Sequence, residues 1–139
     1  MPWYPYQNLG DGVPRPYLAL WQDPAIKYVS IIDSGADESC VPLSIAQAWN
    51  VPFDPSQVQI GRGVSGPHQQ WHATGDIVLQ CVAGPLVLHN PGIIDGLPVI
   101  LIGRRDGFAQ YLFTFDQRRL LFMIEPHPPE PAPAPPDPS

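Results

Sequence analysis

The chain has 139 residues, of which 44% are hydrophobic, and a formal net charge of −6; this length suits one domain with a buried core and is too short for a two-lobed enzyme. Its seven lysine and arginine residues form no basic stripe, which argues against a nucleic-acid partner. No apolar run reaches the length of a membrane-spanning helix, and the N-terminus lacks the basic-then-apolar order of a signal peptide, so we expect no membrane association and a cytoplasmic location.

The first third of the chain predicts an arm, two strands and one short helix. Residues 1–16 are rich in proline, tyrosine and glycine and are expected to be extended. Residues 16–21 and 27–32 have the composition of strands, with turn residues between them. Residues 42–49 open with proline and carry apolar residues at helical spacing, which predicts a helix that ends before Pro52.

The middle of the chain predicts a hairpin with a glycine-rich tip. Residues 57–60 and 73–81 have the composition of strands, and residues 61–67 between them contain three glycines. Such a tip can move, and its backbone can approach a ligand closely. His68 and His72 are predicted to be exposed loop residues, because no convergent metal ligands accompany them.

The last third of the chain predicts further strands and a tail. The expected strands are residues 85–89, 97–103 (buried on both faces), 112–115 and 120–124, with a helical turn or two over residues 104–111. Short strands at regular spacing with one brief helix indicate an all-β barrel or sandwich. Eight prolines fall within residues 126–138. We therefore expect a folded domain over residues 1–125 and an extended, disordered, proline-rich tail over residues 126–139.

One motif points to chemistry. The apolar pair Ile31-Ile32 runs directly into Asp33-Ser34-Gly35, so a strand delivers an aspartate into a hydroxyl residue and a glycine. This is the arrangement of the catalytic loop of aspartic peptidases, although Asp-Ser-Gly is also common in ordinary turns. The two cysteines, Cys40 and Cys81, have no metal-ligand spacing and are predicted to be buried reduced thiols.

Three motifs in order resemble the retropepsin family, the single-domain aspartic peptidases of retroviruses and their cellular and bacterial relatives. They are residues 31–37, residues 61–66 in the position of the family's flap, and residues 100–104. The resemblance covers roughly residues 17–124, and residues 103–116 are most similar to the bacterial branch. It implies an all-β, retropepsin-type half-barrel with one or two short helices and a glycine-rich flap hairpin, which forms a homodimer.

The resemblance also implies a function, that of an aspartic endopeptidase that cleaves peptide or protein substrates and needs no metal or other cofactor. Because the chain has one such motif, Asp33 of two identical chains would form the catalytic pair. Two carboxylates about 3 Å apart cannot both ionise, so they share a proton and activate a water by general acid and base catalysis.

Roles for the neighbouring residues follow from the same resemblance. Ser34 would join the two active loops across the dimer, and Gly35 would let the backbone contact the substrate. Gly103 would permit a close crossing behind the loop, and Arg104 would pair with Asp37. The residues expected to bind substrate are Ala36, Asp37, Val64, Ser65, Gly66 and Ile102.

Some positions and the function leave alternatives open. Arg105 stands where the family usually has an acid or asparagine, and Glu38 is predicted to be a solvated charge. The first alternative function is a catalytically silent retropepsin-fold dimer that binds peptides or partner proteins. The second is an unrelated β-sandwich adaptor that uses its proline-rich tail and stays monomeric. A serine hydrolase has no support, because its flanking motif is missing.

Overall fold

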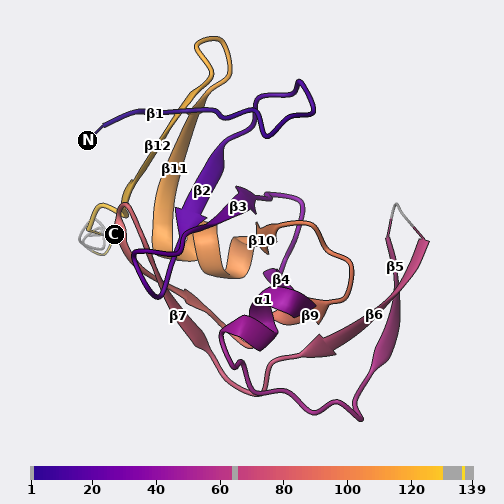
Figure 1. Ribbon diagram of the computed structural model, residues 1–139. Helices are drawn as coiled ribbons and strands as arrows, with labels where there is room; N and C mark the ends of the chain where they lie inside the picture. Colours follow the sequence, from indigo (N-terminus) through magenta and orange to yellow (C-terminus); the bar gives the residue numbers. More distant parts are fainter. Residues whose placement is uncertain (1, 64–65, 130–135, 137–139) are drawn as a thin grey trace.

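The computed structural model describes residues 2–63, 66–129 and 136. Its elements are mostly strands, with two short helical segments, so the predicted all-β fold class is confirmed (Figure 1). The elements are β1 (Tyr4–Pro5), β2 (Tyr17–Leu20), β3 (Tyr28–Ile32), β4 (Cys40–Pro42), α1 (Leu43–Ala48), β5 (Gln59–Gly63), β6 (Gly66–His72), β7 (Ile77–Cys81), β8 (Gly84–Leu88), β9 (Gly92–Ile94), β10 (Ile100–Ile102), η1 (Arg104–Phe108), β11 (Tyr111–Asp116) and β12 (Leu121–Pro126).

The largest sheet has seven strands in the order β2-β3-β10-β4-β9-β6-β5. Strand β10 lies between β3 and β4, parallel to the first and antiparallel to the second. Residues that are 70 positions apart in sequence, such as Ile32 and Ile102, are therefore paired side by side. In Figure 1 the sheet ends in the β5–β6 hairpin, which rises away from the body of the molecule.

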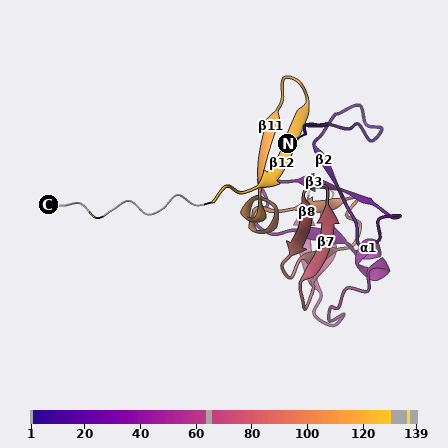
Figure 2. The same cartoon turned by 90° about the vertical axis from the view of Figure 1, so that its left-hand side faces the viewer.

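Two smaller sheets complete the fold. Strands β1, β12 and β11 form one sheet, and β7 pairs with β8 in the other. Figure 2 shows β7 and β8 side by side, with the β11–β12 hairpin at the opposite end of the molecule. The predicted hairpin over residues 112–124 is present, and its turn is closed by Asp116, which accepts hydrogen bonds from the Arg119 backbone and guanidinium at 3.0 and 2.6 Å.

The core is built from the alternate residues of these strands. Leu18 and Leu20 of β2 and Ile100 and Ile102 of β10 are completely or almost completely buried. Leu79, Leu86, Leu88 and Ile93 meet them from β7, β8 and β9. The buried hydroxyl of Ser30 on β3 has a hydrogen-bond partner on β2, because it donates to the Leu18 carbonyl at 2.8 Å. Because side chains alternate along a strand, the other residues of β3 and β10 lie on the face opposite the core.

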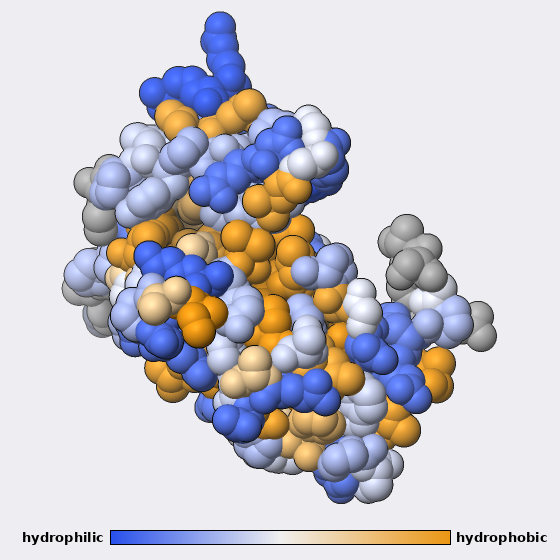
Figure 3. Space-filling model, viewed as in Figure 1, coloured by the Kyte–Doolittle hydropathy of each residue, from blue (hydrophilic) through white to orange (hydrophobic). Residues whose placement is uncertain are grey.

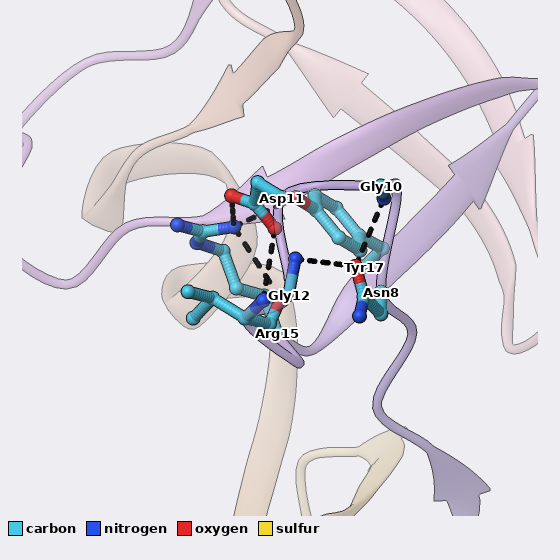
Figure 4. A network of polar contacts seen from close by, with 7 residues as sticks. Asn8, Gly10, Asp11, Gly12, Arg15 and Tyr17 are labelled. Carbon is cyan, nitrogen blue, oxygen red and sulfur yellow. Dashed lines mark hydrogen bonds and ion pairs between the residues drawn. The ribbon is translucent and has the colours of Figure 1, made fainter.

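The N-terminal arm is less extended than its composition predicts. Strand β1 does lie along β12, but residues 8–15 form a compact loop closed by the pairing of Gln7 with Arg15. Figure 4 shows its network: the Asn8 side chain accepts from the Gly10 and Gly12 amides at 2.9 and 3.0 Å, and Asp11 pairs with Arg15. The hydrogen bond from Arg15 holds the pKa of the Asp11 carboxyl below its usual value.

The prediction of a strand over residues 73–81 is wrong in the extent of the strand, which is Ile77–Cys81, and in its pairing partner. The partner of β5 is β6, and the later strand, β7, pairs with β8 instead. The sequence of β6, Gly-Pro-His-Gln-Gln-Trp-His, lacks apolar alternation because none of its residues is fully buried and only Trp71 packs against the core. His68 and His72 consequently lie on a strand rather than in a loop.

Two other expectations need correction. Strand β10 is shorter than the predicted residues 97–103 and is buried on one face only, since Leu101 between Ile100 and Ile102 is half-buried. The three-residue strands β4 and β9 were not predicted at all, because they are too short to show a period.

The last strand of the structure ends close to the start of the proline-rich segment. Strand β12 ends at Pro126, and the His127 imidazole donates to the Phe108 carbonyl at 2.8 Å. Most of the predicted proline-rich tail, residues 130–135 and 137–139, lies outside the described residues. Within the part of the chain that is described, no helix is long and apolar enough to cross a membrane.

Burial of β10 gives a stability prediction. We expect Ile100→Ala, at a side chain with 0% exposure, to lower the free energy of unfolding by about 2–5 kcal/mol, because it leaves a cavity in the core. Val78→Ala, on the exposed face of β7 with 56% exposure, is the control and should change it by less than about 0.5 kcal/mol. Denaturant unfolding measures both; equal effects would contradict the assigned core.

Candidate active site

Asp33 lies just beyond the end of β3 but stays attached to the sheet. Its amide donates to the Ile102 carbonyl at 2.9 Å, which continues the β3–β10 pairing by one residue. The carboxylate oxygen Oδ1 accepts a hydrogen bond from the Gly35 amide at 2.9 Å. The loop therefore fixes the direction of the carboxylate. Asp33 is half-buried, while Ser34 and Gly35 are exposed.

A second set of backbone contacts holds the rest of this loop against the start of η1. The Arg104 amide donates to the Ala36 carbonyl at 2.8 Å, and the Arg105 amide donates to the Asp37 carbonyl at 3.0 Å. Behind them, the Gly103 amide donates to the hydroxyl of the fully buried Ser39 at 3.0 Å. The Asp-Ser-Gly motif and the Gly-Arg motif are thus in direct contact, although the sequence separates them widely.

Gly103 is where the two segments approach most closely. A Cβ atom placed there would lie 2.5 Å from the backbone carbon and oxygen of Glu38. No side chain fits at that distance, and both neighbours are backbone atoms that cannot move aside. This crossing explains the need for glycine at position 103, where the resemblance also implied a close crossing.

Arg104 and Asp37 form an ion pair through their side chains. The side chains are 56% and 78% exposed, so the pair contributes roughly 0–1 kcal/mol to folding. Its effect is on the direction of the loop rather than on global stability. The same two residues also lie in the backbone contacts between the loop and η1, which gives the pair a defined geometry.

The buried acid of this region is Asp106, one residue later than the resemblance implies. Arg105 is exposed, whereas Asp106 is fully buried and accepts a hydrogen bond from the His89 amide at 3.1 Å. Segment η1 is a π-helical turn, in which the Ala109 amide bonds to the Arg104 carbonyl. A π-turn holds one more residue than an α-helical turn, and here the exposed Arg105 lies between Arg104, which pairs with Asp37, and the buried Asp106.

An apolar row lies on the face of the sheet opposite the core. Leu101 is paired with Ile31 on one side and with Cys40 on the other, and all three side chains are half-buried. Alternation along the chain puts Asp33 on the same face as Ile31. Ile102, which was expected to bind substrate, has 0% exposure and faces the core, whereas Leu101 and Ile31 are half-buried on the opposite face.

The predicted flap corresponds to the β5–β6 hairpin. Its strands pair from Gln59 with Gln70 up to Gly63 with Gly66, where Gly66 has a φ of +103° that glycine adopts without strain. Val64 and Ser65, two of the expected substrate-binding residues, lie outside the described residues. Figure 3 shows the molecule hollowed between this hairpin and the main body.

The thiol of Cys40 is not set up as a nucleophile. Burial, together with the negative charges of Glu38 and Asp33, raises the pKa of this thiol to about 11. The thiol therefore stays protonated near neutral pH. Among the residues that the structure describes, no three histidine, cysteine or acidic side chains are grouped to hold a metal ion.

Two contacts of the loop were not predicted from sequence. The Ser39 hydroxyl supports Gly103, as described above, and Glu38 contacts His72 of β6 at 3.1 Å rather than being a free solvated charge. No spacing rule connects a loop residue with a strand residue 34 positions later. The only sequence signal for Glu38 was its position directly after Asp37.

Comparison with known proteins gives similarity in structure alone. No protein-family model and no curated protein matches the sequence. The chain is similar to the crystal structure of a retropepsin-like aspartic protease from Rickettsia conorii, with 19% identity over 86% of each chain and a TM-score of 0.49. It is also similar to the solution structure of Simian Foamy Virus (mac) protease, with 18% identity over 66% of this chain and 90% of that chain and a TM-score of 0.42. Both likenesses concern the fold.

The crossing at Gly103 gives a second prediction. We expect Gly103→Ala to destabilise the protein by about 3 kcal/mol, the upper end of the range for overpacking, because the methyl group would meet Glu38 backbone at 2.5 Å. Gly75→Ala is the control, since a Cβ there meets nothing within 4 Å. Thermal and denaturant unfolding measure both variants. A stable Gly103→Ala protein would show that the two motifs do not cross as described.

Proposed function

We propose that this chain is an aspartic endopeptidase that acts as a homodimer, with Asp33 of each chain forming the catalytic pair. The observation that carries the proposal is the setting of Asp33. Its carboxylate is oriented by the Gly35 amide at the end of an apolar strand, and the loop around it is supported from behind by the Gly103–Arg105 segment. A turn aspartate with no further role would not need this second layer of support.

The chemistry needs two such carboxylates. When two carboxylates lie about 3 Å apart, one proton is shared between them, because both cannot be ionised together. The ionised member takes a proton from a water molecule, and the protonated member donates to the carbonyl oxygen of the scissile bond. The water oxygen attacks the carbonyl carbon, and the C–N bond then breaks with transfer of a proton to the amine. No metal or covalent intermediate is required.

One chain has one Asp-Ser-Gly motif, so the second carboxylate must come from a second copy across a two-fold axis. The exposure of Ser34 and Gly35 fits this need, since both residues would meet their counterparts in a dimer. A monomer would be inactive, because a single carboxylate cannot act as acid and base at once.

The substrate fits as an extended peptide with apolar side chains near the scissile bond. Ile31 and Leu101 offer half-buried apolar surface on the face that carries Asp33. The β5–β6 hairpin would cover the peptide and bind its main chain through β-type hydrogen bonds. Backbone recognition gives affinity for many sequences, whereas the apolar pockets give a preference among them.

The central test is the removal of the proposed catalytic carboxylate. We expect Asp33→Asn to abolish cleavage of a peptide library, read by mass spectrometry over about pH 4–7, while the variant stays folded. Wild-type activity should rise with the square of enzyme concentration when the protein is dilute, because only the dimer is active.

A mixing experiment serves as its control. Excess Asp33→Asn should inhibit the wild-type protein, since mixed dimers carry a single carboxylate. Cleavage that survives Asp33→Asn would disprove the proposal. A folded dimer that binds peptides without cleaving any of them would instead identify the catalytically silent binding module, and a stable monomer would favour the β-sandwich adaptor.

Substrate preference gives a separate prediction. We expect Leu101→Ala to raise KM or change the preferred residues beside the cleaved bond, with a loss of 10–200-fold as the range for a shortened apolar contact (about 1–3 kcal/mol). Stability should change little, because Leu101 is only half-buried. Ile102→Ala is the contrasting neighbour: it should destabilise the core and leave the cleavage preference of the folded fraction unchanged. The reverse pattern would contradict the assignment of the two faces.

A further inference from the structure

A contact between Glu38 and His72 joins the loop of Asp33 to the β5–β6 hairpin. The His72 Nε2 atom lies 3.1 Å from Glu38 Oε1. A carboxylate only accepts hydrogen bonds, so the imidazole is the donor. Glu38 lies in the loop that leads from Asp33 to β4, and His72 is the last residue of β6. The two elements are not neighbours in the sheet, because β9 lies between them.

Gly92 of β9 lies between the two residues of this contact. It is paired with Cys40 of β4 on one side and with His72 of β6 on the other. A Cβ atom at Gly92 would lie 3.2 Å from the Cys40 sulfur and 3.8 Å from Glu38 Oε1. The Glu38 carboxylate thus lies beside Gly92 and reaches the imidazole.

The two ends of the contact are anchored in different ways. The backbone of Glu38 is packed against Gly103, and the preceding residue, Asp37, is paired with Arg104. His72 is held by the pairing of β6 with β9, at the base of a hairpin whose tip is at Gly63 and Gly66. A displacement of the hairpin base would therefore be transmitted to the loop that carries Asp33, through one side-chain contact.

We propose that this Glu38–His72 tether couples the position of the β5–β6 hairpin to the loop of Asp33, which makes Glu38 and His72 positioning residues. The proposal rests on the peptidase function proposed above. The tether keeps the hairpin base in register with the active loop when a peptide binds. His72 touches neither the substrate nor the water molecule, and acts only through Glu38.

The expected loss of activity without the tether is small, because both side chains of the tether are partly exposed to solvent. The two side chains are 44% and 40% exposed, and pairs of this kind contribute about 0.2–1 kcal/mol, equal to about a 1.4–5-fold change. We expect His72→Ala and Glu38→Ala each to lower kcat/KM by about two- to fivefold. The double variant should be no worse than either single variant, because both remove the same contact.

Two further variants distinguish loss of the Glu38–His72 contact from a general loss of folding or activity. His72→Gln keeps a donor near the same position and should restore at least half of the activity lost in His72→Ala. His89→Ala is the matched control: its imidazole lies 3.3 Å from Asp76, with side chains that are each 48% exposed, outside the active loop. His89→Ala should leave kcat/KM unchanged.

A second measurement does not depend on activity. In an Asp33→Asn background, amide hydrogen exchange is followed over residues 34–38 and 66–72. Loss of the tether predicts that His72→Ala speeds exchange in residues 34–38 and that Glu38→Ala speeds exchange in residues 66–72, whereas His89→Ala does neither. Exchange confined to the mutated segment would overturn the tether.

The two proposals fail in distinguishable ways. Absence of cleavage by the wild-type dimer overturns the peptidase function, and hydrogen exchange still decides whether the tether exists. Normal cleavage with additive losses in the double variant, or with the same loss in His89→Ala, overturns the tether and leaves the peptidase function standing.

Discussion

The rest of the structure depends on the crossing of two backbone segments at Gly103. The loop that follows Asp33 and the turn that begins η1 are in contact through the hydrogen bonds of Ala36, Asp37 and Ser39 and through the absence of a side chain at Gly103. This contact can form only if β10 is inserted between β3 and β4. The sheet order, the direction of the Asp33 carboxylate and the separation of a core face from a ligand face all follow from that one insertion.

Stability and function are divided between the two faces of β3 and β10. Ile102 and Ile32 contribute to the core, whereas Ile31 and Leu101 leave apolar surface beside Asp33. A sheet whose second face is only half-covered loses some of the hydrophobic stabilisation that a fully buried sheet would have. The peptidase that we propose would recover part of it when a second copy or a peptide covers that face.

How much could be predicted from the sequence depended on the range of the interaction concerned. Strong local signals identified β2, β3, α1 and the β11–β12 hairpin, since proline, turn residues and apolar runs act within a few positions. Strand β6 was missed because its polar sequence is dictated by solvent exposure, and β4 and β9 were missed because three residues carry no period. Asp33, Gly103 and Arg104 were identified through their motifs, but the choice between Ile102 and Leu101 required knowledge of which face is buried. The Glu38–His72 contact reaches across a third strand, β9, and no local sequence pattern indicates it.

The π-turn at η1 has a consequence for how such chains are compared. Arg105 occupies an additional place between Arg104, which stays beside Asp37, and Asp106, which stays beside His89. The π-turn thus separates two residues with different roles, an exposed arginine paired with Asp37 and a fully buried aspartate bonded to the His89 amide, by one exposed residue. The Gly-Arg motif is therefore better described by the contacts of Arg104 and Asp106 than by the number of residues between them.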